Sequence, residues 1–357
     1  MHVGAFGQSS QSLDNPDVPG RVHPPDQNAI ENARDRLDAL ATPAGALGRL
    51  GELAVWASGV LGSTPPSRLT SVRSVIFAGD HGISDYGVSA YPKNITGAMV
   101  RAMNSGRSGA CALAAEHGVD VRVLDIGCAE EFEDPAIGAF KVNHGSRPIH
   151  LADGLDDDEA DRAFQAGRQI ADAEISAGAQ MLIAGDMGIG NTTPAAALIA
   201  AGLGVPASEV TGRGTGIDDS ALLQKQQLVQ QAVDRVGSRT DDPWQTTLAL
   251  GSADLTAATG FMIRAASRGV PVLLDGVISV ACALSAERLA PGTVAWFAAG
   301  HRSTEQAQSL ALDKLGLSPI LDLDMRLGEG SGAIAAVPVI RSAIAVLRDT
   351  ALLASLQ

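Results

Sequence analysis

Residues 181–194, MLIAGDMGIGNTTP, combine glycines, an acid and hydroxyls in a spacing that could bind a phosphate. The apolar run ends at Gly185-Asp186 and passes through two more glycines to Thr193-Pro194. Because threonine is a frequent N-cap and proline suits the first helical position, the segment predicts a strand, a tight loop and a helix. A helix N-terminus there would offer free N–H groups to an anion. We interpret the segment as a phosphate loop with Asp186 at its mouth; the alternative is an ordinary turn that needs glycine.

A second apolar run, residues 74–78, ends in Gly-Asp80-His81-Gly. An Asp-His pair between glycines at the end of a strand could orient a ligand or take part in acid–base chemistry. It could equally form a hydrogen-bonded plug that holds the next loop, and this structural role is the interpretation that we favour.

Residues 87–92, GVSAYP, place the hydroxyl of Ser89 and the aromatic ring of Tyr91 in a predicted turn. Such a loop could form one wall of a pocket for a flat ring. The alternative is a surface turn in which Tyr91 packs against the protein.

Residues 211–219, TGRGTGIDD, form a second glycine-rich loop that opens a predicted helix, with Lys225 one to two turns inside that helix. The glycines lack the spacing of a dinucleotide-binding loop, so alone they are weak evidence. Two glycine loops that each lead into a helix, with a lysine nearby, fit a phosphorylated ligand better than either loop does alone. Judged by residue type, Lys225 is nevertheless expected to be exposed to solvent.

Glu329 lies among three glycines in the sequence LGEGSGA, directly after the last predicted strand. The glycines would bring the backbone close to a ligand and would leave no side chains to screen the acid. Glu329 could therefore act as a general base. The alternative is an acid at the N-terminus of the terminal helix, predicted over residues 333–347, where it would interact with the helix dipole.

Apolar runs that read as strands alternate with helical patterns along most of the chain. The strands are predicted at residues 74–78, 121–127, 181–185, 270–275, 294–298 and 319–324, and helices between them at 158–177, 219–236, 253–268, 278–289 and 303–315. This alternation predicts parallel pairing through right-handed crossovers. We therefore expect an α/β fold with a doubly wound, mostly parallel, six-stranded Rossmann-like sheet. Because several strands end in Gly or Asp, the active site is expected at their carboxyl edge.

The chain ends suggest a smaller helical domain beside this sheet. Residues 1–26, rich in Gly, Ser, Pro and Asp, predict a flexible arm. Residues 27–71 carry two helical patterns and form the first part of a small helical domain. Residues 72–328 are assigned to the large substrate-binding α/β domain. Residues 329–357 supply the loop with Glu329 and a terminal helix that completes the small domain.

Composition excludes several classes of function. A net charge of −14 with no basic patch argues against nucleic-acid and acidic-membrane partners. Cys111, Cys128 and Cys282 lie far apart, so we expect reduced core thiols in a cytoplasmic protein. The N-terminus lacks a signal pattern, and we expect no bilayer-spanning segment. No cluster of side chains demands a metal, and no cofactor is expected.

Taken in order, these motifs resemble those of the nicotinate-nucleotide–dimethylbenzimidazole phosphoribosyltransferase family, which makes the lower-ligand nucleotide of cobalamin. The resemblance runs from about Thr42 to Ala336. It rests on TPAGALGRL at 42–50, AGDHG at 78–82, GVSAYP at 87–92, GDMGIGNTT at 185–193, GRGTGID at 212–218, GHRS at 300–303 and GEG at 328–330.

The resemblance implies a doubly wound parallel sheet with a small helical domain from both chain ends, assembled as a homodimer. It implies phosphoribosyl transfer from nicotinate mononucleotide to 5,6-dimethylbenzimidazole, giving α-ribazole 5′-phosphate and nicotinate. The small-molecule substrates would then be the only ligands, with no metal or cofactor.

Carried over position by position, the resemblance makes Glu329 the general base. It also implies that six residues surround the aromatic base: Ser89, Tyr91, Asp80, His81, Met187 and Leu327. Another ten would hold the nucleotide and its phosphate: Asp186, Gly188, Gly190, Asn191, Thr192, Thr193, Gly214, Gly216, Lys225 and Ser303.

Two positions depart from the family pattern. Asp186 stands where glutamate is usual, so a direct contact with substrate could be replaced by one through water. Ala98 stands where a glutamine often precedes Met99, so a polar contact to the aromatic base could be missing. Transfer to another base, such as adenine, a phenol or a different benzimidazole, is therefore the nearest alternative. A non-catalytic nucleotide-binding protein is the other, and the presence of Glu329 argues against it.

Overall fold

The fold is built on a six-stranded sheet in which all neighbouring strands are parallel, as predicted. The computed structural model describes residues 20–356. The strands are β1 (Val72–Gly79), β2 (Val119–Gly127), β3 (Met181–Met187), β4 (Val272–Leu274), β5 (Phe297–Arg302) and β6 (Pro319–Asp322). Their order in the sheet, β2-β1-β3-β4-β5-β6, reverses direction between β1 and β3. Such a reversal opens a crevice for ligands at the carboxyl ends of the strands.

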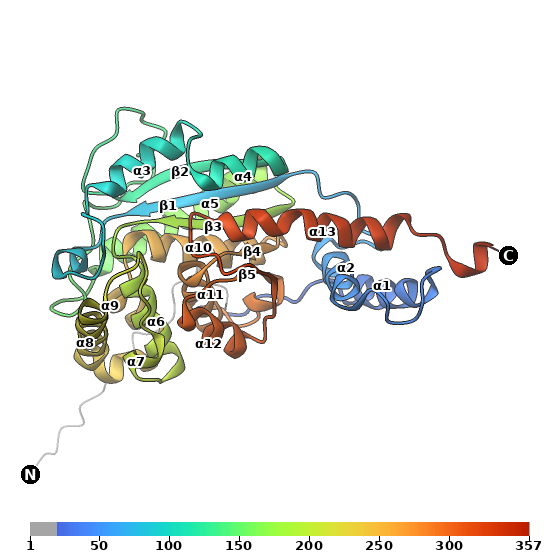
Figure 1. The fold of residues 1–357 in the computed structure, drawn as a ribbon. Coiled ribbons are helices and arrows are strands. Elements are labelled where there is room, and N and C mark those ends of the chain that lie inside the picture. The colour runs from blue at the N-terminus through green and yellow to red at the C-terminus, as the bar shows by residue number, and fades with distance from the viewer. Residues whose placement is uncertain (1–19, 357) are drawn as a thin grey trace, which may run out of the picture.

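Helices cover both faces of the sheet (Figure 1). Strand β1 shows why, because Val75 and Phe77 join the large core on one face while Val72 and Ile76 belong to clusters on the other. The large core contains α5 (Asp157–Ser176), α6 (Thr192–Leu203), α10 (Ala253–Ser267), α11 (Val277–Leu289) and α12 (Gln306–Leu315). The opposite face packs against α3 (Ile95–Asn104), α4 (Gly109–His117) and α13 (Ser331–Asp349).

Helices α7 (Ala207–Val210), α8 (Asp219–Val236) and α9 (Pro243–Leu250) also contribute to the large core. The 3-10 helices are η1 (Gly82–Tyr86), η2 (Gly237–Asp241), η3 (Thr293–Trp296) and η4 (Leu353–Leu356). The three cysteines are free thiols, with Cys128 and Cys282 buried and Cys111 half-buried.

The fifth strand lies further along the chain than predicted. Residues 294–296 belong to the 3-10 helix η3, and β5 continues through Gly300 and His301 to Arg302. Gly300 permits this course because an added Cβ there would lie 2.6 Å from the Cα of Ala333, at the start of α13. The shift places His301 in the sheet, close to its carboxyl edge.

Helix α13 joins the sheet to the N-terminal helices. Its first half packs on the sheet through Ala333, Ile334 and Val337. Its second half, through Ala343 and Leu347, packs with α1 (Gln27–Ala39) and α2 (Gly48–Leu61). Figure 1 shows these three helices extending away from the sheet. A division into two domains remains a prediction.

By length and composition alone, α13 could cross a membrane, contrary to our expectation that no segment would do so. It is the one such helix among residues 20–356, and 56% of its apolar window is buried inside the protein. Its apolar character is explained by its two sets of packing partners.

Part of the predicted flexible arm packs against the protein. Val22 is buried, and its N–H donates to the carbonyl of Pro291 at 3.0 Å. The indole Nε1 of Trp296 donates to the carbonyl of His23 at 2.8 Å. The prediction was therefore wrong for residues 22–26, because the apolar contacts and the hydrogen bonds to the η3 region hold them; residues 1–19 lie outside the described residues.

Helices α5 and α10 approach closely because a glycine lies at their contact. An added Cβ at Gly167 would clash with the carbonyl oxygen of Ala257 and would lie 2.9 Å from the backbone nitrogen of Phe261. We expect Gly167→Ala to lower the free energy of unfolding by about 1–3 kcal/mol, because overpacking outweighs the ~1 kcal/mol gain in helix propensity. Urea denaturation measures the change. Gly138→Ala is the matched control, since an added Cβ there meets nothing within 4 Å; equal stability of the two variants would contradict the prediction.

Candidate active site

A cavity of about 570 Å³ lies at the carboxyl edge of the sheet, as predicted. Its floor includes the ends of β3, β4 and β5, contributed by Asp186, Asp275 and His301. Its volume is in the range of pockets that hold small molecules. Three loops complete its walls: residues 87–92 (the Tyr91 loop), residues 211–218 (the Gly214 loop) and residues 323–330 (the Glu329 loop).

Glu329 lines this cavity in a strained backbone conformation. Its φ is +62°, between Gly328 at +77° and Gly330 at +83°. A non-glycine residue in the left-handed region costs free energy, and such residues are concentrated at functional sites. The side chain is 6% exposed, and its Oε2 accepts a hydrogen bond of 3.3 Å from the N–H of Ala110 in the first turn of α4. The carboxylate is thus held by a helix N-terminus while it faces the cavity.

A glycine in β3 allows this loop to cross the sheet. An added Cβ at Gly185 would lie 2.8 Å from the carbonyl carbon of Glu329 and 3.0 Å from the nitrogen of Gly330. Gly185, which the sequence indicated as the end of a strand, therefore sets how closely the Glu329 loop approaches Asp186.

Asp275, which follows β4, fixes the other side of the loop. Its carboxylate accepts hydrogen bonds from the N–H groups of Gly330 at 3.1 Å, Gly332 at 2.8 Å and Ala333 at 3.2 Å. The Nε2 of His301 lies 3.4 Å from Asp275 Oδ1. Burial opposes ionisation of Asp275, but His301 and the N–H donors outweigh burial and lower its pKa. The alternative role for Glu329, an acid at the N-terminus of the terminal helix, is wrong because Asp275 occupies that position.

The glycine loop after β3 leads into a helix, but the helix begins earlier than predicted. The N-cap is Asn191 and α6 starts at Thr192, which makes Pro194 the third helical residue. Proline is tolerated there because N–H groups in the first turn have no acceptor within the helix. Thr193 is fully buried beneath the loop. Gly190 has a φ of +90°, which bends the chain into the helix.

Four of the predicted nucleotide-binding residues in this loop line the cavity, namely Asp186, Gly188, Asn191 and Thr192. Gly190 and Thr193 shape the loop from behind. The Nδ2 of Asn191 donates to Asp186 Oδ1 at 2.6 Å. Burial, followed by the nearby carboxylate of Asp254, raises the pKa of Asp186 well above its ordinary value. Asp186 is therefore shifted toward its protonated form at the cavity wall.

Lys225 is buried, contrary to the prediction that it is exposed to solvent. It is 0% exposed, and its Nζ donates to Thr192 Oγ1 at 2.7 Å and to the carbonyl of Gly212 at 3.1 Å. Burial lowers its pKa to about 8, against the opposing effect of Glu305. The lysine thus lies one layer behind the lining, where it joins α6 to the Gly214 loop. Gly214 and Ser303 line the cavity, whereas Gly216 turns the loop with a φ of +101°.

The predicted wall for a flat ring is present in part. Tyr91, Met187 and Leu327 line the cavity, and the ring of Tyr91 is not packed down, because the residue is 56% exposed. Ser89 lies outside the lining and makes a hydrogen bond to Thr215 instead. Ala98 is exposed on α3, whereas its neighbours Ile95 and Met99 face the cavity. Ala98 itself therefore contributes nothing to the cavity wall.

Asp80 and His81 lie outside the cavity lining and form the plug that we favoured. His81 is buried, with its Nε2 3.2 Å from Asp254 Oδ2. Burial opposes protonation of His81, but the Asp254 carboxylate prevails and raises its pKa. Asp80 Oδ2 accepts a hydrogen bond from the N–H of Ala129 at 2.9 Å, and its carbonyl accepts one from the N–H of Ser146 at 2.9 Å.

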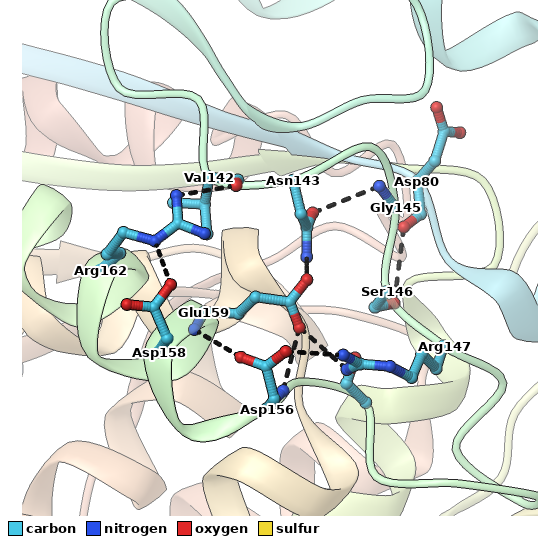
Figure 2. A network of polar contacts seen from close by, with 11 residues as sticks. Asp80, Val142, Asn143, Gly145, Ser146, Arg147, Asp156, Asp158, Glu159 and Arg162 are labelled. Atoms are coloured by element: carbon cyan, nitrogen blue, oxygen red, sulfur yellow. Dashed lines mark hydrogen bonds and ion pairs between the residues drawn. The ribbon is translucent and has the colours of Figure 1, made fainter.

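Figure 2 shows how the segment with Ser146 is fixed in turn. Asp156 and Glu159 form a capping box at the start of α5. Arg147 pairs with Asp156 at 3.0 Å and with Glu159 at 2.9 Å. Asn143 donates to Glu159 at 3.1 Å. The acidic segment before α5 therefore supports the loop beneath the Asp80 turn.

Sequence reasoning missed four ionisable residues of the cavity lining, Asp275, His301, Glu305 and Arg326, and two with hydroxyl groups, Thr215 and Ser279. Glu305 Oε1 accepts the N–H of Gly214 at 2.8 Å, and Arg326 Nη1 donates to the carbonyl of Gly214 at 3.0 Å. The acid after a strand and the Gly-His-Arg-Ser motif were visible signals for the first two. Nothing local in the sequence marks Glu305 or Arg326.

A family model, several named relatives and a solved structure are all similar to this chain over most of its length. The chain matches a family model described as phosphoribosyltransferase (DBI_PRT) over residues 22–356. A nicotinate-nucleotide–dimethylbenzimidazole phosphoribosyltransferase of Mycobacterium marinum (strain ATCC BAA-535 / M) is 48% identical over 330 residues, covering 92% of each chain. Its namesake in Mycobacterium leprae (strain TN) is 47% identical over 326 residues, covering 91% of this chain and 93% of the relative. The crystal structure of CobT from Thermus thermophilus is 39% identical with a TM-score of 0.88, covering 91% of this chain and 97% of that one.

Replacing Asp275 by Asn tests the contact that holds the Glu329 loop. The amide keeps the volume but loses the charge and one acceptor, so we expect the free energy of unfolding at pH 7 to fall by about 1.5–3 kcal/mol. Because the folded pKa of Asp275 is lowered, its contribution is present above the ordinary value of 3.8 and is lost as the pH falls through the folded pKa. Urea denaturation should show the difference from the parent protein shrinking below pH 4. Asp161→Asn, on the exposed side of α5, is the control; a difference that does not depend on pH would refute the assignment.

Proposed function

The chain belongs to the nicotinate-nucleotide–dimethylbenzimidazole phosphoribosyltransferase family, and from this premise we propose how its cavity performs the transfer. The enzyme is a phosphoribosyltransferase of cobalamin biosynthesis. We propose nicotinate mononucleotide as the donor and 5,6-dimethylbenzimidazole as the acceptor. The observation that carries the proposal is that the Glu329 carboxylate and the glycine loop at the start of α6 line one cavity.

The nucleotide phosphate would bind where α6 begins, near Thr192 and Gly214. The helix N-terminus offers N–H groups and a positive dipole end to the phosphate. Lys225, behind these two residues, adds a positive charge that is shielded from solvent. The acceptor ring would lie near Tyr91, Met187 and Leu327, which give part of the cavity lining an aromatic and apolar character.

Glu329, which lines the same cavity, is suited to accept the proton that the acceptor must lose. One ring nitrogen of the benzimidazole attacks C1′ of the ribose, and the other nitrogen gives its proton to the carboxylate. The bond from C1′ to the pyridinium nitrogen breaks, and its electron pair returns to that nitrogen. Because the leaving ring becomes neutral, nicotinate needs no general acid. Attack on the face opposite the leaving group converts a β-riboside to an α-riboside.

Positioning would supply much of the acceleration. Holding the phosphate at one end of the cavity and the ring at the other brings the attacking nitrogen and C1′ together, which converts a bimolecular reaction into an effectively unimolecular one. The carboxylate of Glu329 is held by the N–H of Ala110, and the next residue, Gly330, is held by Asp275. The base would therefore need little rearrangement to accept the proton.

The remaining assignments rest on the resemblance. We propose that the enzyme is cytoplasmic and acts as a homodimer. Because Ala98 makes no contact with the cavity, transfer to another base stays the nearest alternative.

Chromatography with mass detection tests the reaction. Purified protein with nicotinate mononucleotide and 5,6-dimethylbenzimidazole should yield α-ribazole 5′-phosphate and free nicotinate. Glu329→Gln should lower kcat by about 10²–10⁴-fold, the usual contribution of a general base, while it still binds the nucleotide. Glu52→Gln, exposed on α2, is the control. Near-normal turnover by Glu329→Gln would remove Glu329 from its role, and nucleotide binding without product from the parent protein would favour a non-catalytic function.

The buried lysine predicts a pH dependence. Because the pKa of Lys225 is lowered to about 8, it loses its charge as the pH rises through that value. The second ionisation of a phosphate ester has a pKa of about 6, so it is nearly complete at pH 8. We therefore expect kcat/KM for nicotinate mononucleotide to fall above pH 8, a limb that reports the free enzyme.

Lys225→Met should raise KM for the nucleotide and abolish that limb of the profile. Lys314→Met, exposed on α12, is the control and should keep the parent profile. If the decrease above pH 8 persists in Lys225→Met, another group is responsible.

A further inference from the structure

The three loops around the cavity meet at two adjacent residues, Gly214 and Thr215. The Tyr91 loop lies between η1 and α3, the Gly214 loop between α7 and α8, and the Glu329 loop between β6 and α13. They are far apart in the sequence and carry different parts of the proposed site. Contacts among them could therefore make one part of the site depend on another.

Thr215 joins the Gly214 loop to the Tyr91 loop. Its Oγ1 accepts a hydrogen bond of 2.8 Å from the N–H of Ala90 and lies 3.1 Å from Ser89 Oγ. Ser89 Oγ in turn accepts the N–H of Tyr91 at 3.2 Å. A single hydroxyl group thus holds the backbone from which the Tyr91 ring extends into the cavity. This also explains why Ser89 makes no part of the lining.

Arg326 joins the same segment to the Glu329 loop. It lies three residues before Glu329, and its Nη1 donates to the carbonyl of Gly214 at 3.0 Å. Arg326 also lines the cavity. The Gly214 loop is therefore hydrogen-bonded to the Tyr91 loop through Thr215 and to the Glu329 loop through Arg326.

From behind, buried groups anchor the Gly214 loop to the proposed phosphate region. Glu305 accepts the N–H of Gly214, and Lys225 donates both to Gly212 and to Thr192. The outer contacts differ from these, because Ala90, Thr215 and Arg326 are exposed to solvent. Exposed hydrogen bonds compete with water, so the Tyr91 loop and residues 323–327 of the Glu329 loop, outside the segment held by Ala110 and Asp275, belong to the part of the protein that opens most easily. A ligand on the Gly214 loop would order all three loops together.

We propose that Thr215 and Arg326 are positioning residues through which the bound phosphoribosyl group orders the Tyr91 loop and the Glu329 loop for the incoming base. The inference rests on the proposed function, since it takes the phosphate to bind at the Gly214 loop. A ligand that orders a segment bears the entropic cost for the next ligand, so the two bind cooperatively. By linkage, each strengthens the other by the same factor.

Ribose 5-phosphate is a suitable probe because it carries the sugar and the phosphate but no leaving group. The dissociation constant of 5,6-dimethylbenzimidazole is measured by titration calorimetry with and without saturating ribose 5-phosphate. For the parent protein we expect binding to tighten by at least about fivefold, the lower end of typical coupling between sites. In Thr215→Val, which keeps the shape but lacks the hydroxyl, the ratio should fall to about one. Thr215→Ser should retain it.

Steady-state kinetics provides a second measurement. In Thr215→Val we expect KM for the base, measured at saturating nicotinate mononucleotide, to rise several-fold, while KM for nicotinate mononucleotide extrapolated to zero base stays within about twofold. Thr70→Val is the matched control, because Thr70 is exposed and its Oγ1 makes a hydrogen bond of 3.1 Å to Gln180 just before β1, far from the carboxyl edge. It should leave both the coupling and the kinetics unchanged.

Three results would overturn the inference. They are no tightening in the parent protein, full tightening in Thr215→Val, and loss of ribose 5-phosphate binding by Thr215→Val, which would make Thr215 a direct ligand. Failure of the proposed function is seen separately, as absence of product from the parent protein in the transfer assay.

Discussion

The buried carboxylate of Asp275 links the sheet to the loop that carries Glu329. It extends from the end of β4 and accepts hydrogen bonds from Gly330, Gly332 and Ala333, the N-terminal residues of α13 and its cap. A buried charge without such partners is costly, as are the unpaired N–H groups of a buried helix end. Each therefore stabilises the other. The left-handed conformation of Glu329 persists because this contact fixes the chain on its C-terminal side.

The same principle governs the other acids at the cavity. Glu329 accepts an N–H at the start of α4, and Glu305 accepts the N–H of Gly214. Asp186 is shifted toward its protonated form by burial and by Asp254. The carboxylates at the cavity are thus directed to backbone N–H groups or shifted toward their neutral form. In the proposed function, this would leave the charge of Lys225 to act on the nucleotide phosphate through the start of α6.

The errors of prediction share a physical cause. Lys225 was expected at the surface because lysine is rarely buried, but Thr192 and Gly212 satisfy its ammonium group within the fold. The strand at 294–298 lies at Phe297–Arg302 instead, because contact with α13 lets Gly300 and His301 extend the sheet. Residues 22–26 looked flexible because their partners near Pro291 are distant in the sequence. In each case a long-range contact overrode a local preference.

Alternating apolar runs and helical patterns, which depend only on residue type and order, determined the parallel α/β sheet, its active edge and the presence of a glycine-flanked acid at Glu329. The sequence alone also indicated the glycine loop before α6. Only the tertiary structure decided which residues face the cavity and which lie behind it. It places Asp186 and Tyr91 in the cavity lining and Asp80 and His81 outside it, and it adds Asp275 to the lining. The local sequence could not show this, because side-chain burial is set by how the elements pack together.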